Sequence, residues 1–415
     1  MHVAVLGAGV VGVTTAWYLV EAGHQVTVID RQPAPALEAS FANGGQISVS
    51  HAEPWANPAA PLKVLQWLGR EDAPLLWRWR ADASQWEWGL RFLRECTPDR
   101  TRANILAILR LALYSRTMLR TLRLATGIQY DHLERGILHL YFDEREFARA
   151  VPQAALMSSH GCDRVVKSAD ECIAIEGALA GSELKLVGGI FAASDESGDA
   201  CKFTQELASR CALRGVNFRY GTSILNLLRD GGRIGGVGMQ GGEVLTADAY
   251  VTALGSYTPL LLRPLGMKMP LVPAKGYSAT IPLDPDSIVP TVSLIDDQRK
   301  LVFSRLGNRL RVAGTAEFNG YDTSLNAVRC EALLDRCLKL FPHIGRRTGI
   351  EFWAGLRPAT PGNVPIVGGT AFPNLYINTG HGTLGWTMSC GSGRLLADLV
   401  SGREPEISAT EYAPF

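Results

Sequence analysis

A glycine-rich turn between a short strand and a helix constrains this sequence more than any other feature. Residues 2–6 (HVAVL) are an apolar run with β-branched side chains, as expected of a buried strand. Residues 7–12 (GAGVVG) have the spacing G-x-G-x-x-G, residues 13–22 have a helical pattern, and residues 25–29 form a second strand that ends in Asp30. This order predicts a dinucleotide-binding unit of strand, helix and strand.

Each residue of the turn has a physical role in that interpretation. Gly7 permits the tight turn, Gly9 lets the backbone approach a pyrophosphate, and Gly12 lets the helix pack closely on the strand. The helix N-terminus offers unpaired N–H groups to phosphate oxygens, and the Asp30 carboxylate can accept hydrogen bonds from a ribose. The pattern alone does not separate FAD from NAD, and a tight turn without a ligand is the alternative.

Composition narrows the class of protein. The chain has 415 residues, 47% hydrophobic and 20% charged, with a net charge of +1. These values fit a globular protein of two or three domain-sized units with no general attraction to nucleic acid. Its eight cysteines include no C-x-x-C pair, so we expect reduced thiols and no metal site. Because the first strand starts at residue 2 and no long apolar run follows, we expect a cytoplasmic protein without a signal peptide or spanning helix.

Two later stretches suit loops on a ligand. Residues 40–47 (SFANGGQI) combine small residues with amide side chains, which supply paired donors and acceptors. An ordinary surface turn is the alternative for this stretch. Residues 380–385 (GHGTLG) form a second glycine-rich loop that opens a helix. Both stretches follow a predicted strand, where ligand loops of open sheets commonly lie.

Six of the nine tryptophans lie between Trp55 and Trp88, and residues 77–80 (WRWR) alternate aromatic and cationic side chains. A basic aromatic surface of this kind could lie on a membrane interface, which leaves peripheral contact with the inner membrane open. Buried aromatic side chains in a helical cap are the alternative, and we favour that interpretation.

The remaining chain alternates helices and strands. Residues 100–126 have a helical apolar stripe with arginines off it, and residues 195–199 (DESGD) form an acidic turn suited to a solvated loop and helix cap. We predict that four later segments are strands of one antiparallel sheet: residues 269–281, 291–295, 300–305 and 309–315.

Several motifs together carry a family resemblance that covers nearly the whole chain. They are VLGAGVVGVTTAWYLVEAGHQVTVIDR at the start, then NGGQIS, SDESGD, GSYTPLLL, KGYS, FWAGLRPATP and INTGHGTLGWTMSCGSG. The chain resembles the FAD-dependent D-amino acid dehydrogenases, within the glycine oxidase and D-amino acid oxidase superfamily. The resemblance implies a flavoprotein oxidoreductase of bacterial amino-acid catabolism, with FAD as cofactor.

The resemblance also implies a fold and domain boundaries. The expected class is α/β, with a Rossmann-like FAD-binding domain and a substrate domain built from an antiparallel sheet and helices. We expect the FAD-binding domain at residues 1–54, 196–258 and 350–415, and the substrate domain at residues 55–195 and 259–349.

The resemblance assigns cofactor contacts position by position. The expected FAD-binding residues are Gly7, Gly9, Gly12, Asp30, Arg31, Ser40, Asn43, Gly44, Gly45, Gln46, Gly380, His381, Gly382, Thr383 and Leu384. The last five match a loop whose N–H groups face the pyrimidine edge of the isoalloxazine, where a helix N-terminus would stabilise the negative charge of a reduced flavin. For His381, a brace within the loop is the alternative to a flavin contact.

The resemblance assigns the substrate side of the site to fewer residues. Arg357 matches the arginine that holds the substrate carboxylate, a role suited to two parallel hydrogen bonds, with a structural ion pair as the alternative. Tyr277 is a second catalytic candidate, with core packing as the alternative, and His51 is a candidate for the substrate entrance. One departure is Gly362, which stands where the family commonly has an acid.

The reaction implied by the resemblance is oxidation of a D-amino acid to an imino acid, which hydrolyses to a 2-oxo acid and ammonia. A hydride would pass from Cα to flavin N5, and the electrons would pass to a quinone or another acceptor. Two alternatives remain open: an oxidase or dehydrogenase of cyclic or secondary amines such as D-proline, hydroxyproline or sarcosine, and a flavoprotein without catalysis.

Overall fold

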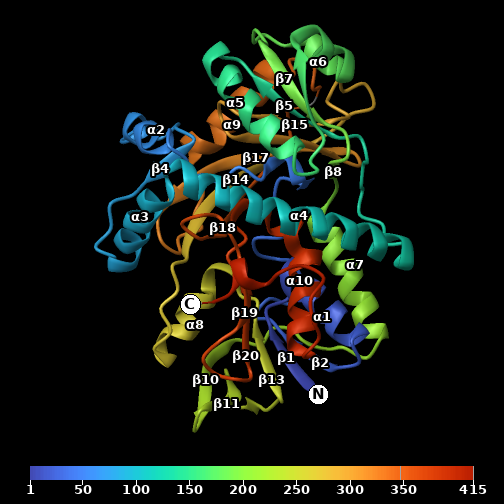
Figure 1. Ribbon diagram of the computed structural model, residues 1–415. Helices are drawn as coiled ribbons and strands as arrows, with labels where there is room; N and C mark the ends of the chain where they lie inside the picture. The colour runs from blue at the N-terminus through green and yellow to red at the C-terminus, as the bar shows by residue number, and fades with distance from the viewer. Residues whose placement is uncertain (346, 415) are drawn as a thin grey trace.

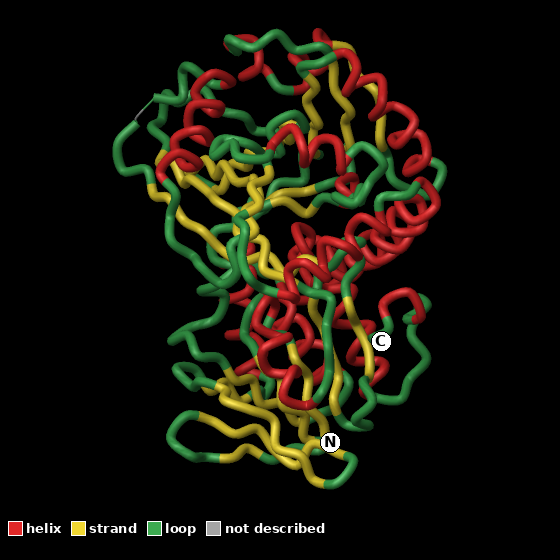
Figure 2. The backbone as a smooth tube through the Cα atoms, turned by 90° about the vertical axis from the view of Figure 1, so that its left-hand side faces the viewer, coloured by secondary structure: helices red, strands yellow, loops and turns green. Residues whose placement is uncertain are grey.

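The computed structural model describes residues 1–345 and 347–414. Two sheets organise the chain, one above the other in the views of Figures 1 and 2. The lower sheet has six strands in the order β19 (Ile366–Gly369), β20 (Leu375–Thr379), β13 (Ala249–Thr252), β1 (His2–Leu6), β2 (Gln25–Ile29) and β9 (Asn217–Arg219). All neighbours are parallel except β19 and β20. The predicted Rossmann-like arrangement is therefore present, and we call this part the six-stranded domain.

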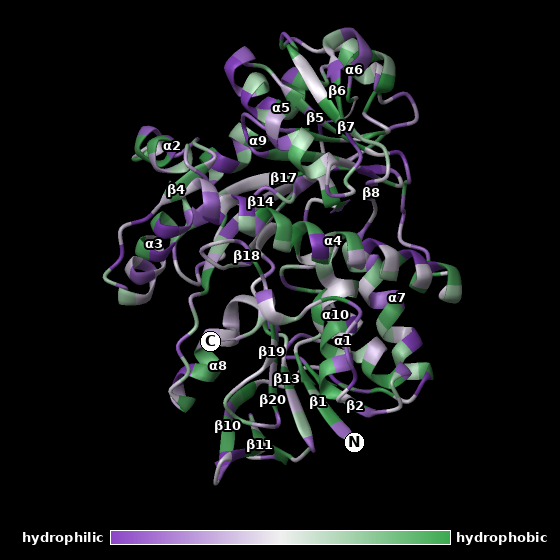
Figure 3. Ribbon diagram, viewed as in Figure 1, coloured by the Kyte–Doolittle hydropathy of each residue, from purple (hydrophilic) through white to green (hydrophobic). Residues whose placement is uncertain are grey.

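Helices cover one face of this sheet. They are α1 (Val10–Glu21), α7 (Ala200–Leu213) and α10 (Gly385–Val400), and the long α4 (Pro98–Thr126) packs on α10. The buried side chains of these helices share one hydrophobic core with the sheet. Figure 3 shows α10 as largely hydrophobic, and it packs between α1 and α4. A Cβ at Gly393 would lie 3.0 Å from the backbone of Thr14, and one at Gly391 would lie 2.8 Å from the Ser115 side chain. Small residues therefore let three helices approach one another closely.

The other face of the six-stranded sheet carries a small antiparallel sheet. Its strands are β10 (Ile224–Asp230), β11 (Arg233–Met239) and β12 (Val244–Leu245). Side chains of β10 and β11 share a core with the sheet, and the short helix α8 (Thr258–Leu262) closes the end of that core.

The upper sheet has nine strands. The order is β18 (Glu351–Ala359), β14 (Val272–Pro282), β17 (Arg309–Phe318), β16 (Leu301–Leu306), β15 (Ser293–Asp296), β5 (Ile137–Tyr141), β7 (Gly188–Ala192) and β6 (Arg164–Ser168), with β4 (Leu75–Trp77) beside β17. The four strands predicted to pair with one another are antiparallel neighbours. The sheet as a whole is mixed, because β15 pairs with β5, and β4 with β17, in parallel.

Three helices complete this nine-stranded domain. They are α9 (Ala327–Leu340), α5 (Glu144–Ser158) and α6 (Ala169–Ile175). Leu333 and Cys337 of α9 pack in one core with β14, β16 and β17, which places α9 against one face of the sheet.

Two segments lie on the other side of the expected domain boundaries. Strand β18 (Glu351–Ala359) pairs along its whole length with β14, so the sheet pairing favours a boundary after Ala359 and not at residue 350. Helix α4, expected in the substrate domain, buries its apolar stripe in the core of the six-stranded domain. In Figure 1 this helix crosses the molecule between the two sheets.

The tryptophan-rich segment forms a flank with α2 (Ala60–Trp67), β4 and α3 (Ala83–Glu95). Trp77 and Trp88 pack against Phe318 of the nine-stranded sheet with ring centroids 5.1 and 5.0 Å apart, as the helical-cap interpretation requires. Trp79 and Trp86, by contrast, are 70% and 44% exposed. None of the helices among the described residues has both the length and the hydrophobicity needed to cross a bilayer.

Candidate active site

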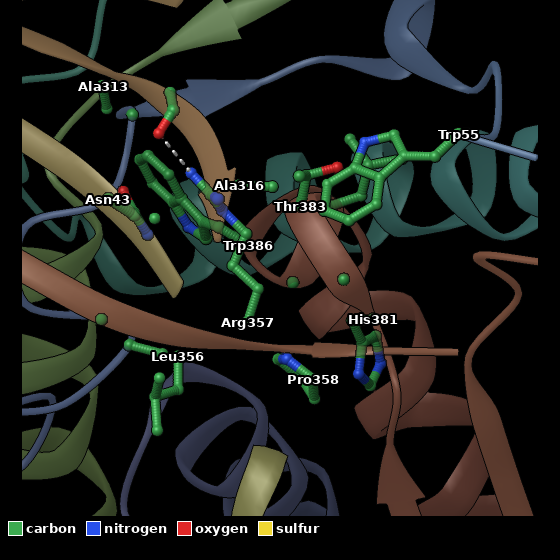
Figure 4. Close-up of a pocket in the computed structure, with 18 of the residues that line it drawn as sticks. Asn43, Trp55, Ala313, Ala316, Leu356, Arg357, Pro358, His381, Thr383 and Trp386 are labelled. Atoms are coloured by element: carbon green, nitrogen blue, oxygen red, sulfur yellow. Dashed lines mark hydrogen bonds between the residues drawn. The ribbon is translucent and has the colours of Figure 1, made fainter. Parts of the chain in front are cut away.

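A cavity of about 1320 Å³ lies between the two domains. Its wall includes both glycine-rich loops, the loop at residues 40–46 and the strand that carries Arg357. Figure 4 shows Arg357, His381, Thr383 and Trp386 around part of this space, contributed by β18 and by the segment that opens α10. The sequence stretches predicted to bind a ligand therefore meet at one place.

The first glycine turn is fixed by the backbone around it. Gly7 has φ +110°, and a Cβ there would lie 2.6 Å from the Ala253 carbonyl oxygen. A Cβ at Gly12 would lie only 1.9 Å from the Gly7 carbonyl oxygen. A Cβ at Gly9 would meet only the Ser40 hydroxyl, at 3.5 Å. Gly7 and Gly12 are thus required by the fold, whereas Gly9 leaves open space at the N-terminus of α1.

Asp30 and Arg31 border the same cavity. The Asp30 carboxylate accepts hydrogen bonds from the backbone N–H groups of Ala8 (2.6 Å) and Gln32 (2.8 Å), and burial raises its pKa. These bonds hold the carboxylate beside the glycine turn. Arg31 pairs with Glu38 at 2.6 Å and lies over the Tyr257 ring, 4.0 Å from its centroid.

The loop at residues 40–46 is held from both domains. The Ser40 hydroxyl accepts a hydrogen bond from the Val10 N–H (3.1 Å), and the Asn43 side chain accepts one from Gly45 (3.0 Å). The Gln46 amide donates to the Ser293 hydroxyl of β15 at 2.8 Å. A Cβ at Gly44 would lie 2.4 Å from Val302, so this loop packs directly on β16. The alternative interpretation of residues 40–47 as an ordinary surface turn is therefore wrong.

The acidic turn at residues 195–199 pairs with the end of this loop and accepts hydrogen bonds from the residues that follow it. Strand β3 (Gln46–Ile47) pairs with β8 (Glu196–Ser197), and the Asp195 carboxylate accepts from the backbone of Val49 (3.0 Å) and Ser50 (3.1 Å). Asp199 caps α7, as predicted. The prediction of a solvated turn is wrong, because Asp195 and Glu196 are fully buried.

The second glycine-rich loop begins with left-handed residues, Gly380 (φ +81°) and Gly382 (φ +54°). Thr383 and Leu384 follow in a short 3₁₀ turn that leads into α10, and the loop borders the cavity. The His381 ring nitrogen Nε2 is 2.9 Å from the Ser392 hydroxyl, and burial lowers the pKa of His381 to about 3. This neutral imidazole therefore braces the loop against α10 while it borders the cavity.

Arg357 enters the cavity from β18 without a carboxylate partner among the described residues. Its guanidinium donates to the backbone carbonyls of Thr315 (2.6 Å) and Gly314 (3.3 Å). Burial, with the Arg329 guanidinium nearby, lowers the pKa of Arg357 to about 10, so it stays charged at neutral pH. A half-buried cation whose partners are neutral carbonyls is suited to bind an anionic group.

The expectation that Tyr277 faces the substrate is wrong. Arg357 pairs with Ala274 and Tyr277 with Ala354 across β14 and β18, and neighbouring strand residues point to opposite faces. The Tyr277 hydroxyl donates to Glu317, and its ring packs beneath α9 with Arg329 5.4 Å from the ring centroid. Tyr277 borders the cavity, but its side chain belongs to the core on the other face of the sheet.

His51 borders the cavity in a polar cluster that the sequence alone does not indicate. Its ring stacks on that of His139, with centroids 6.0 Å apart. The His139 ring lies 2.8 Å from the Ser50 hydroxyl and 3.0 Å from the Asp297 carboxylate. Burial lowers the pKa of His51 to about 3. These residues come from different elements, so no spacing in the sequence signals that they meet.

The departure at Gly362 has a structural reason. A Cβ at this position would lie 2.7 Å from the Asn104 amide nitrogen on α4. Asn104 donates in turn to Glu95, at 2.8 Å. Helix α4 thus occupies the space that a side chain at residue 362 would need.

Comparison with known proteins identifies the family. The family of FAD-dependent oxidoreductases known as DAO matches residues 2–399. The chain belongs to this family. It is 62% identical to a D-amino acid dehydrogenase of Dechloromonas aromatica over 98% of each chain. It is 56% identical to one of Paramagnetospirillum magneticum over 98% of this chain and 97% of the relative.

Solved structures support the same fold. A glycine oxidase of Geobacillus kaustophilus matches with a TM-score of 0.79 at 21% identity, over 100% of this chain and 98% of the other. An iminodiacetate oxidase of Chelativorans matches with a TM-score of 0.75 at 22% identity, over 99% and 98%. At such identities the likeness shows the fold alone.

The cavity fits the FAD of this family. The open space at Gly9 lies at the N-terminus of a helix of 12 residues, whose partial positive charge suits a pyrophosphate. The half-buried Asp30 carboxylate lies at the end of the neighbouring strand, where a ribose would lie in such a fold. The loop at residues 380–384 borders the same cavity and opens a second helix. Thus the chain is an FAD-dependent oxidoreductase, and the cavity between its two domains fits the cofactor.

Proposed function

We propose that this flavoprotein oxidises D-amino acids to 2-oxo acids and ammonia. Its relatives at 62% and 56% identity carry the name D-amino acid dehydrogenase over nearly their whole length. The observation that carries the proposal is Arg357, a half-buried guanidinium that borders the cavity and whose hydrogen-bond partners among the described residues are neutral carbonyls. A carboxylate would complete its hydrogen bonds, and every amino acid brings one.

The proposed cofactor contacts are the residues of the two glycine loops and the segment between them. FAD would supply the acceptor for the hydride that leaves the substrate Cα. We assign its binding to the residues of these segments that border the cavity: Gly7, Gly9, Asp30, Arg31, Ser40, Asn43, Gly44, Gly45, Gln46, His381, Gly382, Thr383 and Leu384. Gly12 and Gly380 shape the two turns, since a Cβ at either would meet Gly7 or Thr360. In this assignment His381 acts through its bond to Ser392, which fixes the loop.

Arg357 would orient the substrate. Two hydrogen bonds to the carboxylate restrict rotation about the bond to Cα, so the Cα–H is held in one direction. The amine reacts in its neutral form. Catalysis in this proposal depends on orientation and on exclusion of water from the cavity, and it requires no side-chain base.

The proposed electron acceptor is a quinone or a similar carrier, reached by peripheral contact with a membrane. The tryptophan-rich flank supports this part: Trp79 and Trp86 are exposed, as are the leucines Leu62, Leu65, Leu68, Leu90 and Leu93. Interfacial helices bind membranes through such side chains. Flotation with liposomes of bacterial lipid tests the contact, and absence of the protein from the floating fraction would remove it.

A substrate panel tests the reaction. Purified FAD-loaded protein is given D-amino acids, their L-enantiomers, D-proline, hydroxyproline and sarcosine, with an artificial dye as acceptor. The proposal predicts fastest dye reduction with a D-amino acid that has a primary amine, and little with its L-enantiomer. Preference for a cyclic or secondary amine would replace the proposal with oxidation of that class. Anaerobic bleaching of the flavin by substrate would exclude a non-catalytic flavoprotein.

A further inference from the structure

We infer that Gly276 is a positioning residue that leaves room for the Arg357 guanidinium on β14, and that the β-bulge at Thr315 supplies two carbonyls that hold this guanidinium. We call Gly276 and the carbonyls of Gly314 and Thr315 the seat of Arg357. The inference rests on the proposed function, in which Arg357 binds the substrate carboxylate. It concerns the KGYS motif, where Tyr277 points away from the cavity and Gly276, one residue earlier, lies on the face of Arg357.

The Arg357 guanidinium occupies the space that a Cβ at Gly276 would need. A Cβ built on Gly276 would lie 2.2 Å from Cζ, 2.2 Å from Nη1 and 2.3 Å from Nη2 of Arg357. Because the three distances are nearly equal, the plane of the guanidinium faces the missing Cβ. Gly276 borders the cavity with Arg357. Its backbone is not in the left-handed region, so backbone conformation does not require glycine at this position.

A β-bulge completes the seat from the other side. Lys275 pairs with Glu317 but Tyr277 with Gly314, so β17 has one extra residue opposite Gly276. At this point β17 changes partner: Gly314 is the last residue paired with β16, and Ala316 is the first paired with β4. At this change of partner, the carbonyls of Gly314 and Thr315 accept from the Arg357 side chain.

Backbone strain marks the same position. Thr315 has φ +55°, which is unfavourable for a β-branched residue. Its N–H donates to the Lys300 carbonyl at 3.3 Å, and its own carbonyl accepts from Arg357. Figure 4 shows the Arg357 guanidinium with a hydrogen bond drawn as a dashed line. Strain of this kind persists where surrounding structure imposes it, often beside an active site.

The seat fixes the cation without neutralising it. Arg357 donates to two neutral backbone carbonyls through Nη1 and Nη2. Its other N–H groups and its positive charge stay available for an anion. A carboxylate partner would orient the side chain equally well but would compete with the substrate. Gly276 and the two neutral carbonyls therefore position the guanidinium and leave its charge for the substrate.

The substitution Gly276→Ala tests the seat. The atoms it displaces form the end of a flexible side chain, so the fold should persist while the guanidinium moves. Gly369→Ala is the matched control, because it also lies in a strand and its Cβ would come no closer than 3.7 Å to the Tyr376 ring. We expect both variants to retain wild-type FAD content and melting temperature.

The primary readout is the affinity for pyruvate, a non-reducing carboxylate, measured by titration of the visible flavin spectrum. Loss of one charge-assisted hydrogen bond predicts an affinity about 10- to 100-fold weaker in Gly276→Ala and unchanged in Gly369→Ala. KM for the best D-amino acid should rise by a similar factor. In an Arg357→Ala background, Gly276→Ala should have no further effect, because its target is gone.

Each outcome decides the inference. Wild-type pyruvate affinity in Gly276→Ala would overturn it, and so would an equal loss with and without Arg357. If Gly276→Ala does not fold, the inference also fails, because it requires that only the guanidinium be displaced. Failure of the proposed function is distinguishable: the wild-type protein itself would then reduce no dye with any D-amino acid.

Discussion

Gly9 and Gly12 belong to the same motif but are predicted to respond differently to alanine. A Cβ at residue 12 would lie 1.9 Å from the Gly7 carbonyl oxygen, a backbone atom that cannot move alone. Helix α1 must then shift from β1, and overpacking of this kind costs about 1–3 kcal/mol of stability. Gly12→Ala should therefore lower the melting temperature of the protein even after FAD has been removed.

Gly9→Ala should spare the fold and affect the cofactor. Its Cβ would meet only the Ser40 hydroxyl at 3.5 Å, which is ordinary contact. The methyl group instead occupies space that a pyrophosphate needs. A hydrogen bond from an N–H group to a charged oxygen contributes about 1.5–3 kcal/mol to the free energy of binding. Loss of one such bond therefore weakens FAD binding about 10- to 100-fold.

The assay separates folding from binding. Flavin is removed, thermal melting is recorded for each apoprotein at one scan rate, and FAD affinity is then measured by calorimetric titration. Gly232→Ala is the control, because a Cβ there has nothing within 4 Å. Wild-type FAD affinity in Gly9→Ala, or equal loss of apoprotein stability in Gly9→Ala and Gly12→Ala, would show that the two glycines do not have these separate roles.

Three further substitutions test the surroundings of the cavity. Tyr277→Phe should leave kcat/KM within about twofold of wild type but lower the melting temperature, because it removes the buried bond to Glu317; a large loss of activity would restore Tyr277 as a catalytic candidate. His381 has a pKa lowered to about 3 by burial, so its stability contribution is full above the unfolded value near 6.5 and is lost as the pH falls toward 3. At pH 5 the stability lost relative to neutral pH is about 2 kcal/mol. His381→Asn should therefore melt with a flatter pH dependence between 7 and 5 (about 2 units); an unchanged slope would contradict the assignment. Asp195→Ala leaves the buried N–H groups of Val49 and Ser50 without their acceptor, and should cost about 2–5 kcal/mol in chemical denaturation; a neutral effect would show that this loop is held in another way.

Local sequence patterns were sufficient for much of the fold. The turn at residues 7–12 lies between elements adjacent in the chain, so spacing determines their contact. The apolar stripe of α4 was also predictable from the sequence, because apolar residues that recur with the helical period lie on one face of the helix. The second loop was recognisable because its glycines precede the long buried helix α10.

Strand partners and strand faces were not predictable in the same way. Nothing in residues 351–359 indicates that they pair with β14, because sheet partners lie far apart in sequence. The face of Tyr277 depends on register, and a shift of one residue would reverse it. The cluster of His51, His139 and Asp297 depends on β5 and β15 being neighbours, which only the sheet order reveals.

The most direct test of the account is the rate of anaerobic flavin bleaching by a D-amino acid, compared between wild type and Arg357→Ala in stopped flow. We expect the D-enantiomer, and not the L-enantiomer, to bleach the wild-type flavin. Loss of the carboxylate anchor should slow bleaching at low substrate about 100-fold or more, with FAD content unchanged. Equal bleaching rates in the two proteins would contradict the central claim that Arg357 holds the substrate against the cofactor.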